Sequence, residues 1–94
     1  MTDMPVVHIW SQGAWHDSSY IVGDRDGLIK LRDAVDLAIK SGSATAEVFV
    51  SDGEGYDIDV TCVEDTKRLA VPYLESYAKE DRKNVSIIFP WVMK

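Results

Sequence analysis

The segment DRDGLIKLRDAVDLAIKSG, residues 24–42, constrains the fold more than any other part of the chain. Asp24 stands where a helix N-cap is expected, Lys40 falls in the last turn, and Gly42 is suited to end the helix. Apolar residues recur at helical spacing, which predicts a buried face; they are Leu28, Leu31, Val35 and Ala38. The segment therefore predicts one amphipathic helix.

Two apolar runs before this helix predict a β-hairpin. The run PVVHIW ends at Trp10, and a second run extends over residues 15–22, with Gln12-Gly13 between them. A two-residue turn there places Trp10 opposite Trp15 and His8 opposite Asp17. These four side chains then share one face. The opposite face is expected to point to the core and carries Val7, Ile9, Tyr20 and Val22, although a one-residue slip reverses the two faces.

Two alternating runs after the helix, AEVFVSD at 46–52 and YDIDVTC at 56–62, predict a second hairpin around an acidic, glycine-containing turn. Because strand side chains alternate, Tyr56 and Ile58 share one face, and Asp57 and Asp59 share the other with Phe49. The remaining elements are a helix that begins near Pro72 and a strand over residues 85–89.

The expected order is β-β-α-β-β-α-β. It predicts an α+β fold in which a mainly antiparallel sheet carries two helices on one face: a ferredoxin-like sandwich with an extra N-terminal hairpin strand. The chain has 94 residues, of which 46% are hydrophobic. This is enough for one core, so residues 1–94 are predicted to form a single domain.

The chain is acidic, with 10 Lys and Arg against 16 Asp and Glu and a formal charge of −6. Such a charge repels phosphate backbones and anionic lipid, which argues against nucleic-acid and membrane partners and favours a basic protein partner or a cation. Cys62 is the only cysteine, and the N-terminus lacks the features of a signal peptide. Both points predict a cytoplasmic protein.

The paired tryptophans predict a contact surface, because exposed indoles are common in binding hot spots. A cross-strand tryptophan pair also stabilises a hairpin without any partner, so structural packing remains an alternative. His8 and Asp17 resemble an acid–base pair, but no nucleophile motif accompanies them. His16 points away from His8 in this register, which argues against a metal site. We therefore predict no enzymatic activity, catalytic residue, metal or cofactor.

The acidic run of the second hairpin does not match the spacing of an EF-hand calcium loop. It comprises Asp52, Glu54, Asp57 and Asp59. A solvated hairpin tip is one interpretation, and a docking surface for a basic partner is the other. In the second interpretation Phe49 is an apolar anchor within a charged rim.

The stretch IVGDRDGLIKLRDAVDLAIKSG, residues 21–42, resembles a strand-to-helix junction of small bacterial immunity proteins of polymorphic toxin systems, similar to the immunity protein 32 type. The resemblance implies a protein that blocks a toxin by binding it and has no chemistry of its own. It transfers no functional residues, because Gly23, Asp24, Gly27 and Leu28 have the character of structural positions.

These observations predict a small acidic protein that neutralises a basic toxin or effector domain by occlusion. The predicted partner-binding residues are His8, Trp10, Trp15, Asp17, Phe49, Asp52, Glu54, Asp57 and Asp59. The alternative is a small-ligand binder, such as a phage anti-defence protein that sequesters a nucleotide signal. The negative charge disfavours phosphate binding unless a homo-oligomer brings together basic residues such as Arg25, Arg32, Lys67 or Arg68.

Overall fold

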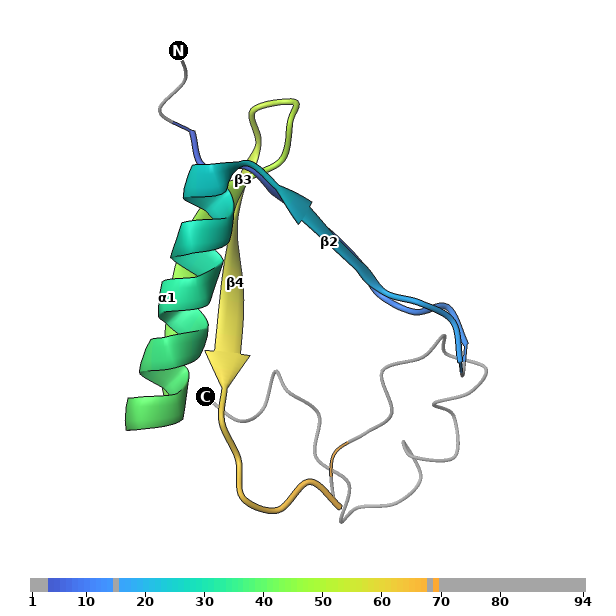
Figure 1. The fold of residues 1–94 in the computed structure, drawn as a ribbon, viewed down its shortest axis with the longest axis vertical. Helices are drawn as coiled ribbons and strands as arrows, with labels where there is room; N and C mark the ends of the chain where they lie inside the picture. Colours follow the sequence, from blue (N-terminus) through green and yellow to red (C-terminus); the bar gives the residue numbers. More distant parts are fainter. Residues whose placement is uncertain (1–3, 15, 68, 70–94) are drawn as a thin grey trace. The chain divides into compact units, whose positions relative to one another are not determined.

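The computed structural model describes residues 4–14, 16–67 and 69. The chain divides into two compact units, one formed by residues 1–10 and 20–63 and the other by residues 11–19 and 64–94. All named strands and the helix, drawn in Figure 1, consist of residues of the first unit. The prediction of a single domain over 1–94 stays a prediction.

Four strands and one helix make up the first unit, in the order β1 (Val7–Trp10), β2 (Tyr20–Gly23), α1 (Arg25–Ser41), β3 (Ser43–Phe49) and β4 (Gly55–Thr61). The strands form two separate two-stranded antiparallel sheets, β1–β2 and β3–β4. Helix α1 lies along one face of the β3–β4 sheet (Figure 1).

The ends of α1 confirm the predicted caps. The Asp24 carboxylate accepts a hydrogen bond of 2.7 Å from the Gly27 backbone N–H, which satisfies a donor that the first helical turn leaves without an intrahelical partner. At the other end, Gly42 has φ 106° and donates its N–H to the Ala38 carbonyl. A side chain disfavours this left-handed conformation, so glycine suits the position.

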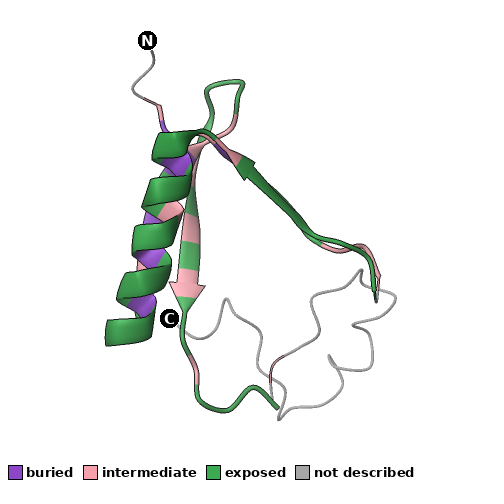
Figure 2. Ribbon diagram, in the orientation of Figure 1, coloured by how far each residue is buried: buried purple, intermediate pink, exposed green. Residues whose placement is uncertain are grey.

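The buried face of α1 matches the predicted one only in part: Ala38 is buried as predicted, and Leu31 is half-buried. The buried residues of the helix are the small ones, Gly27, Ala34 and Ala38 (Figure 2). Leu28 and Val35, which were expected in the core, are 42% and 39% exposed. The reason is close approach: a Cβ on Gly27 would overlap the Val6 carbonyl group and lie 2.9 Å from the Val7 side chain. The helix can approach Val6 and Val7 this closely only because a small residue faces them.

The second hairpin forms as predicted, with shifted strand ends. Residues pair across it from Ser43↔Thr61 to Phe49↔Gly55. The side chains of β3 and β4 alternate between a face that packs on α1 and a face that points away from it. The core lies between the helix and the first face and consists of Val7, Ala34, Ala46 and Val48, flanked by Ala44, Tyr56, Ile58 and Val60.

The predicted ferredoxin-like sandwich is wrong for the described part of the chain, which has one helix and two separate sheets. Between the two sheets the structure describes one backbone pairing, a parallel bridge between Val6 and Phe49. Phe49 is the last residue of β3, and β1 begins at Val7, just after the bridge. The two strands therefore do not pair with each other beyond it. The predicted helix near Pro72 and the strand over residues 85–89 lie outside the described residues.

The register of the first hairpin also differs from the prediction. Trp10 is opposite Tyr20 and His8 is opposite Val22, so residues 11–19 connect the strands and Gln12-Gly13 is not a two-residue turn. Gly23 explains the shift, since any side chain there would overlap the Val6 carbonyl oxygen. In addition, Asp24 accepts a hydrogen bond from the Val6 N–H and donates its own N–H to the Val6 carbonyl. Helix capping and strand register are therefore fixed together.

This register leaves most of the first hairpin exposed. Of the four residues expected in the core, Val7 is fully buried, whereas Ile9, Tyr20 and Val22 are exposed. No helix in the described part of the chain is long and apolar enough to cross a membrane.

The Tyr56 hydroxyl joins β4 to the start of β1 by donating a hydrogen bond to the Val7 carbonyl. Burial raises the pKa of this phenol above 10.0. The folded state therefore holds the proton more tightly than the unfolded chain. The resulting stabilisation is fully present below pH 10.0 and is lost as the pH rises through the raised pKa.

We expect Tyr56→Phe to lower the free energy of unfolding by about 1 kcal/mol near neutral pH. The difference from wild type should shrink above pH 10.0, the ordinary pKa of tyrosine. Urea unfolding of both proteins at neutral pH and at about pH 11 measures it, and comparing the two proteins cancels the titration of the lysines. An equal difference at both pH values would contradict the assigned role of the hydroxyl.

Candidate partner-binding surface

The face of the β3–β4 sheet that points away from α1 carries Phe49 and two of the four predicted acids, Asp57 and Asp59. We call it the outward face and define it by Thr45, Glu47, Phe49, Asp57 and Asp59. All of these side chains are exposed except Phe49, which is half-buried. Alternation along each strand puts them together, as expected from the sequence.

Two carboxylates face each other at the centre of this surface, since Glu47 pairs directly with Asp57. Hydrogen bonds at Val50–Glu54 and Gly42–Cys62 set the alternation of the ladder. They make Glu47 and Asp57 a non-hydrogen-bonded pair, the kind in which side chains lie closer. Like charges in this position destabilise a sheet, by an amount on the order of 0.2–1 kcal/mol.

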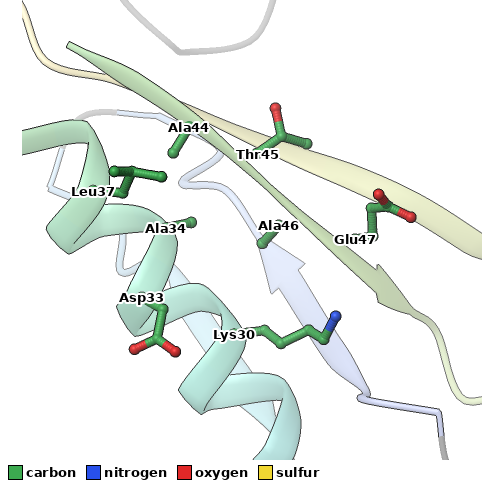
Figure 3. A pocket seen from close by; sticks show the side chains of 8 residues that line it. All are labelled: Lys30, Asp33, Ala34, Leu37, Ala44, Thr45, Ala46 and Glu47. Carbon is green, nitrogen blue, oxygen red and sulfur yellow. The ribbon is translucent and has the colours of Figure 1, made fainter. Parts of the chain in front are cut away.

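Among the described residues, no ion pair neutralises Glu47 or Asp57. Lys30 extends from α1 toward the same end of β3 (Figure 3) but forms no ion pair with either carboxylate. Asp59 is stabilised differently, because it accepts a hydrogen bond of 2.8 Å from the Thr45 hydroxyl. The outward face is therefore strongly negative at its centre.

Phe49 lies at one end of the outward face, and its ring covers Gly55, its cross-strand partner, which has no side chain. A Cβ on Gly55 would lie 3.2 Å from the Phe49 ring. The Phe49 backbone N–H donates to Pro5. A hollow of about 490 Å³ borders Phe49 and is also lined by Pro5, Lys30, Glu47, Tyr56 and Asp57. An apolar ring beside a hollow and two carboxylates suits an anchor with a charged rim.

The hairpin turn holds the other two predicted acids. Asp52 and Glu54 are exposed. The Asp52 carboxylate accepts a hydrogen bond of 3.0 Å from the Glu54 N–H, and Gly53 takes the positive φ of 97° that the turn requires. Asp52 thus shapes the turn itself, whereas the Glu54 side chain adds charge at its tip.

His8 lies next to this turn, although it is 43 positions away from Ser51 in the sequence, and Trp10 neighbours His8. The His8 Nε2 accepts a hydrogen bond of 3.0 Å from the Ser51 N–H, and the His8 and Trp10 rings are 5.5 Å apart with tilted planes. Trp10 is 52% exposed. The first predicted group of binding residues therefore reaches the acidic hairpin through His8.

The other two predicted residues of the first hairpin are not brought into this surface. Trp15 lies outside the described residues. Asp17 is exposed and belongs to the second unit, where its N–H donates to Ala14. The expected cross-strand pairs Trp10–Trp15 and His8–Asp17 are wrong, because Tyr20 and Val22 occupy those positions.

Sequence reasoning missed Glu47 and Tyr20 as site residues. Tyr20 is 59% exposed beside Trp10, and only the correct register reveals it. Glu47 shares its alternation with Phe49, and aligning the two strands about the Asp52-Gly53 turn places it opposite Asp57. The alignment of the two strands about the turn is therefore the sequence signal that could have predicted Glu47 as a site residue.

Besides the hollow at Phe49, two further grooves in the described part of the chain border α1. One, of about 360 Å³, lies between the helix and β3 (Figure 3). The other, of about 580 Å³, is lined by Arg25, Leu28, Ile29 and Arg32. The nucleotide-binding alternative needs Arg25, Arg32, Lys67 or Arg68. Within this chain the Arg32 guanidinium is already hydrogen-bonded to Asp33, and Lys67 belongs to the other unit. No group of three or more His, Cys, Asp or Glu side chains in the described part is arranged to hold a metal ion.

Comparisons with known proteins give no assignment. No family model matches the chain, and neither the curated proteins nor the solved structures contain a match. The resemblance of residues 21–42 to immunity proteins stays a prediction.

Proposed function

We propose that this protein binds a basic protein partner through the outward face and acts as an immunity-type inhibitor that occludes a toxin or effector domain. The carboxylates of the outward face attract and orient the partner. Phe49 supplies an apolar contact; His8, beside the hairpin turn, and its neighbour Trp10 supply aromatic contacts.

The observation that carries the proposal is the Glu47–Asp57 pair. Two exposed carboxylates in a close cross-strand position cost stability, and Lys30 does not neutralise them by an ion pair. Local arrangements that oppose stability occur preferentially at functional sites. A basic partner gives this pair a favourable interaction that the described residues do not supply. The chain's formal charge of −6 acts in the same direction at longer range.

Glu47→Lys separates this function from folding. The lysine creates an opposite-charge pair with Asp57, so we expect the variant to be as stable as wild type or more stable by up to about 1 kcal/mol. Partner binding should weaken by about tenfold or more. Asp36→Lys changes the net charge equally at an exposed position on α1, where Asp36 pairs with Lys40, and should retain binding.

The measurement compares the three proteins as immobilised baits in extract of the source organism. Mass spectrometry identifies proteins that wild type and Asp36→Lys retain and Glu47→Lys loses, and calorimetry with the purified protein confirms the affinity. A basic protein in this class supports the proposal. Equal retention by all three baits, or an acidic protein as the sole difference, contradicts it.

A further inference from the structure

Among the described residues, one edge of β3 has no backbone partner at Thr45 and Glu47, and we call residues 43–47 on that side the open edge. The hydrogen bonds at Val50–Glu54 and Gly42–Cys62 direct the even-numbered backbone groups of β3 toward β4. The N–H and C=O groups of Thr45 and Glu47 therefore point to the other edge. Phe49 confirms this direction, since its N–H donates to Pro5 on that side. Within the described chain, no backbone group pairs with Thr45 or Glu47 there.

A groove runs beside this edge, between β3 and α1 (Figure 3). Small side chains form its apolar part, namely Ala34 on the helix and Ala44 and Ala46 on the strand. Leu37, 52% exposed, also lines it. An open strand edge next to a helix, with room between them, is the geometry that binds an extended peptide as an added strand.

The two sides of an added strand would meet different chemistry. Its side chains alternate, so every second one would enter the groove beside Ala44, Ala46 and Leu37. The others would lie on the outward face, next to Thr45 and Glu47, with Asp57 one strand further away. Small apolar side chains suit the first set beside Ala44 and Ala46, although Lys30 and Asp33 also line the groove. Positive charge favours the second set.

We infer that the open edge of β3 accepts an extended segment of the basic partner, in which small apolar residues alternate with lysine or arginine. This rests on the proposed function and specifies how the partner engages it. The segment spans residues 43–47, because Pro5 and Val6 occupy the edge at Phe49. Backbone hydrogen bonds supply affinity, and the alternation supplies specificity.

A second copy of the chain is the weaker occupant for this edge. Pairing two β3 edges brings the outward faces of both copies side by side, with Glu47 of one near the Thr45–Glu47 row of the other. Neighbouring carboxylates repel each other. A lysine or arginine in the same place attracts them, so the charge of the face selects a basic segment.

Thr45→Pro tests the edge without adding charge. Proline removes the N–H that points to the open edge and leaves the β3–β4 ladder intact, since Thr45 donates no ladder bond to β4. Thr45→Ala is the matched control: it loses the same hydroxyl contact to Asp59 but keeps the N–H. The probe is an acetylated and amidated octapeptide of alternating lysine and valine, compared with a block peptide of the same composition.

NMR titration of the wild-type chain should shift the Thr45 and Glu47 amides with the alternating peptide and not with the block peptide. Calorimetry should show binding about tenfold weaker for Thr45→Pro than for Thr45→Ala, because a carbonyl of the peptide loses its donor. If Thr45→Pro unfolds, the NMR shifts of the Thr45 and Glu47 amides in the wild-type chain still test the inference, because they are measured without a variant.

Three results would overturn the inference. Unchanged Thr45 and Glu47 amides show that the edge takes no strand; if Glu47→Lys still abolishes partner binding, the proposed function stands without strand addition. Protection of these amides from hydrogen exchange in dilute free protein shows that the chain covers its own edge. Protection that increases with protein concentration shows a second copy there.

Discussion

Gly27→Ala is expected to lower the free energy of unfolding by about 3 kcal/mol, although alanine is the better helix former by about 1 kcal/mol. The added Cβ would overlap the Val6 carbonyl oxygen and lie 2.7 Å from the Val6 carbonyl carbon. Both atoms belong to the backbone, so neither can move aside as a flexible side chain does. The helix and the start of β1 would have to separate.

Urea unfolding monitored by circular dichroism measures this effect. Ile39→Ala is the control on the same helix: Ile39 is 66% exposed, and its loss should change stability by no more than about 0.5 kcal/mol. An unchanged or increased stability of Gly27→Ala would show that α1 does not approach Val6 as described.

Asp24→Ala is expected to cost about 2 kcal/mol of unfolding free energy, because one carboxylate oxygen serves two elements. The Asp24 Oδ1 atom accepts hydrogen bonds from the Gly27 N–H at 2.7 Å and from the Val6 N–H at 3.1 Å. Removing it leaves a helix donor and a strand donor without partners.

Asp24→Asn separates geometry from charge. Both bonds end on a single oxygen, and an asparagine carbonyl oxygen can accept both, so we expect this variant to retain most of the stability. Thermal unfolding of the three proteins provides the comparison. A loss for Asp24→Asn as large as for Asp24→Ala would assign the effect to the charge near the helix N-terminus.

Local signals in the sequence predicted α1 and the second hairpin. The Asp24 cap, the Gly42 stop and the acidic turn around Gly53 each act within a few residues, and all three are present in the fold. Alternation along β3 and β4 likewise predicted that Phe49, Asp57 and Asp59 share one face of the hairpin.

Contacts between distant residues decided what the sequence did not predict. The buried side of α1 follows from Val6 and Val7, which require Gly27 beneath them, and not from the larger apolar residues on the helix. The register of β1 follows from Gly23 and Asp24 instead of from a turn signal at Gln12-Gly13. A periodicity argument carries no information about either contact.

The candidate site was predictable to a similar extent. The acidic residues could be recognised in the sequence, but predicting that Glu47 lies directly opposite Asp57 requires the correct alignment of the two strands. The contact of His8 with Ser51 required the parallel approach of Val6 to Phe49. The open edge of β3 followed only from the separation of the two sheets.

The attachment of β1 also sets the order in which the molecule assembles. Its anchors join Pro5 to Phe49, Val6 to Asp24 and Val7 to Tyr56, whereas α1 and the second hairpin close over short stretches of chain. Closing long loops is entropically expensive. During synthesis β1 can pair with β2 and Asp24 early, but its attachment to the second hairpin is complete only after Tyr56 has been made.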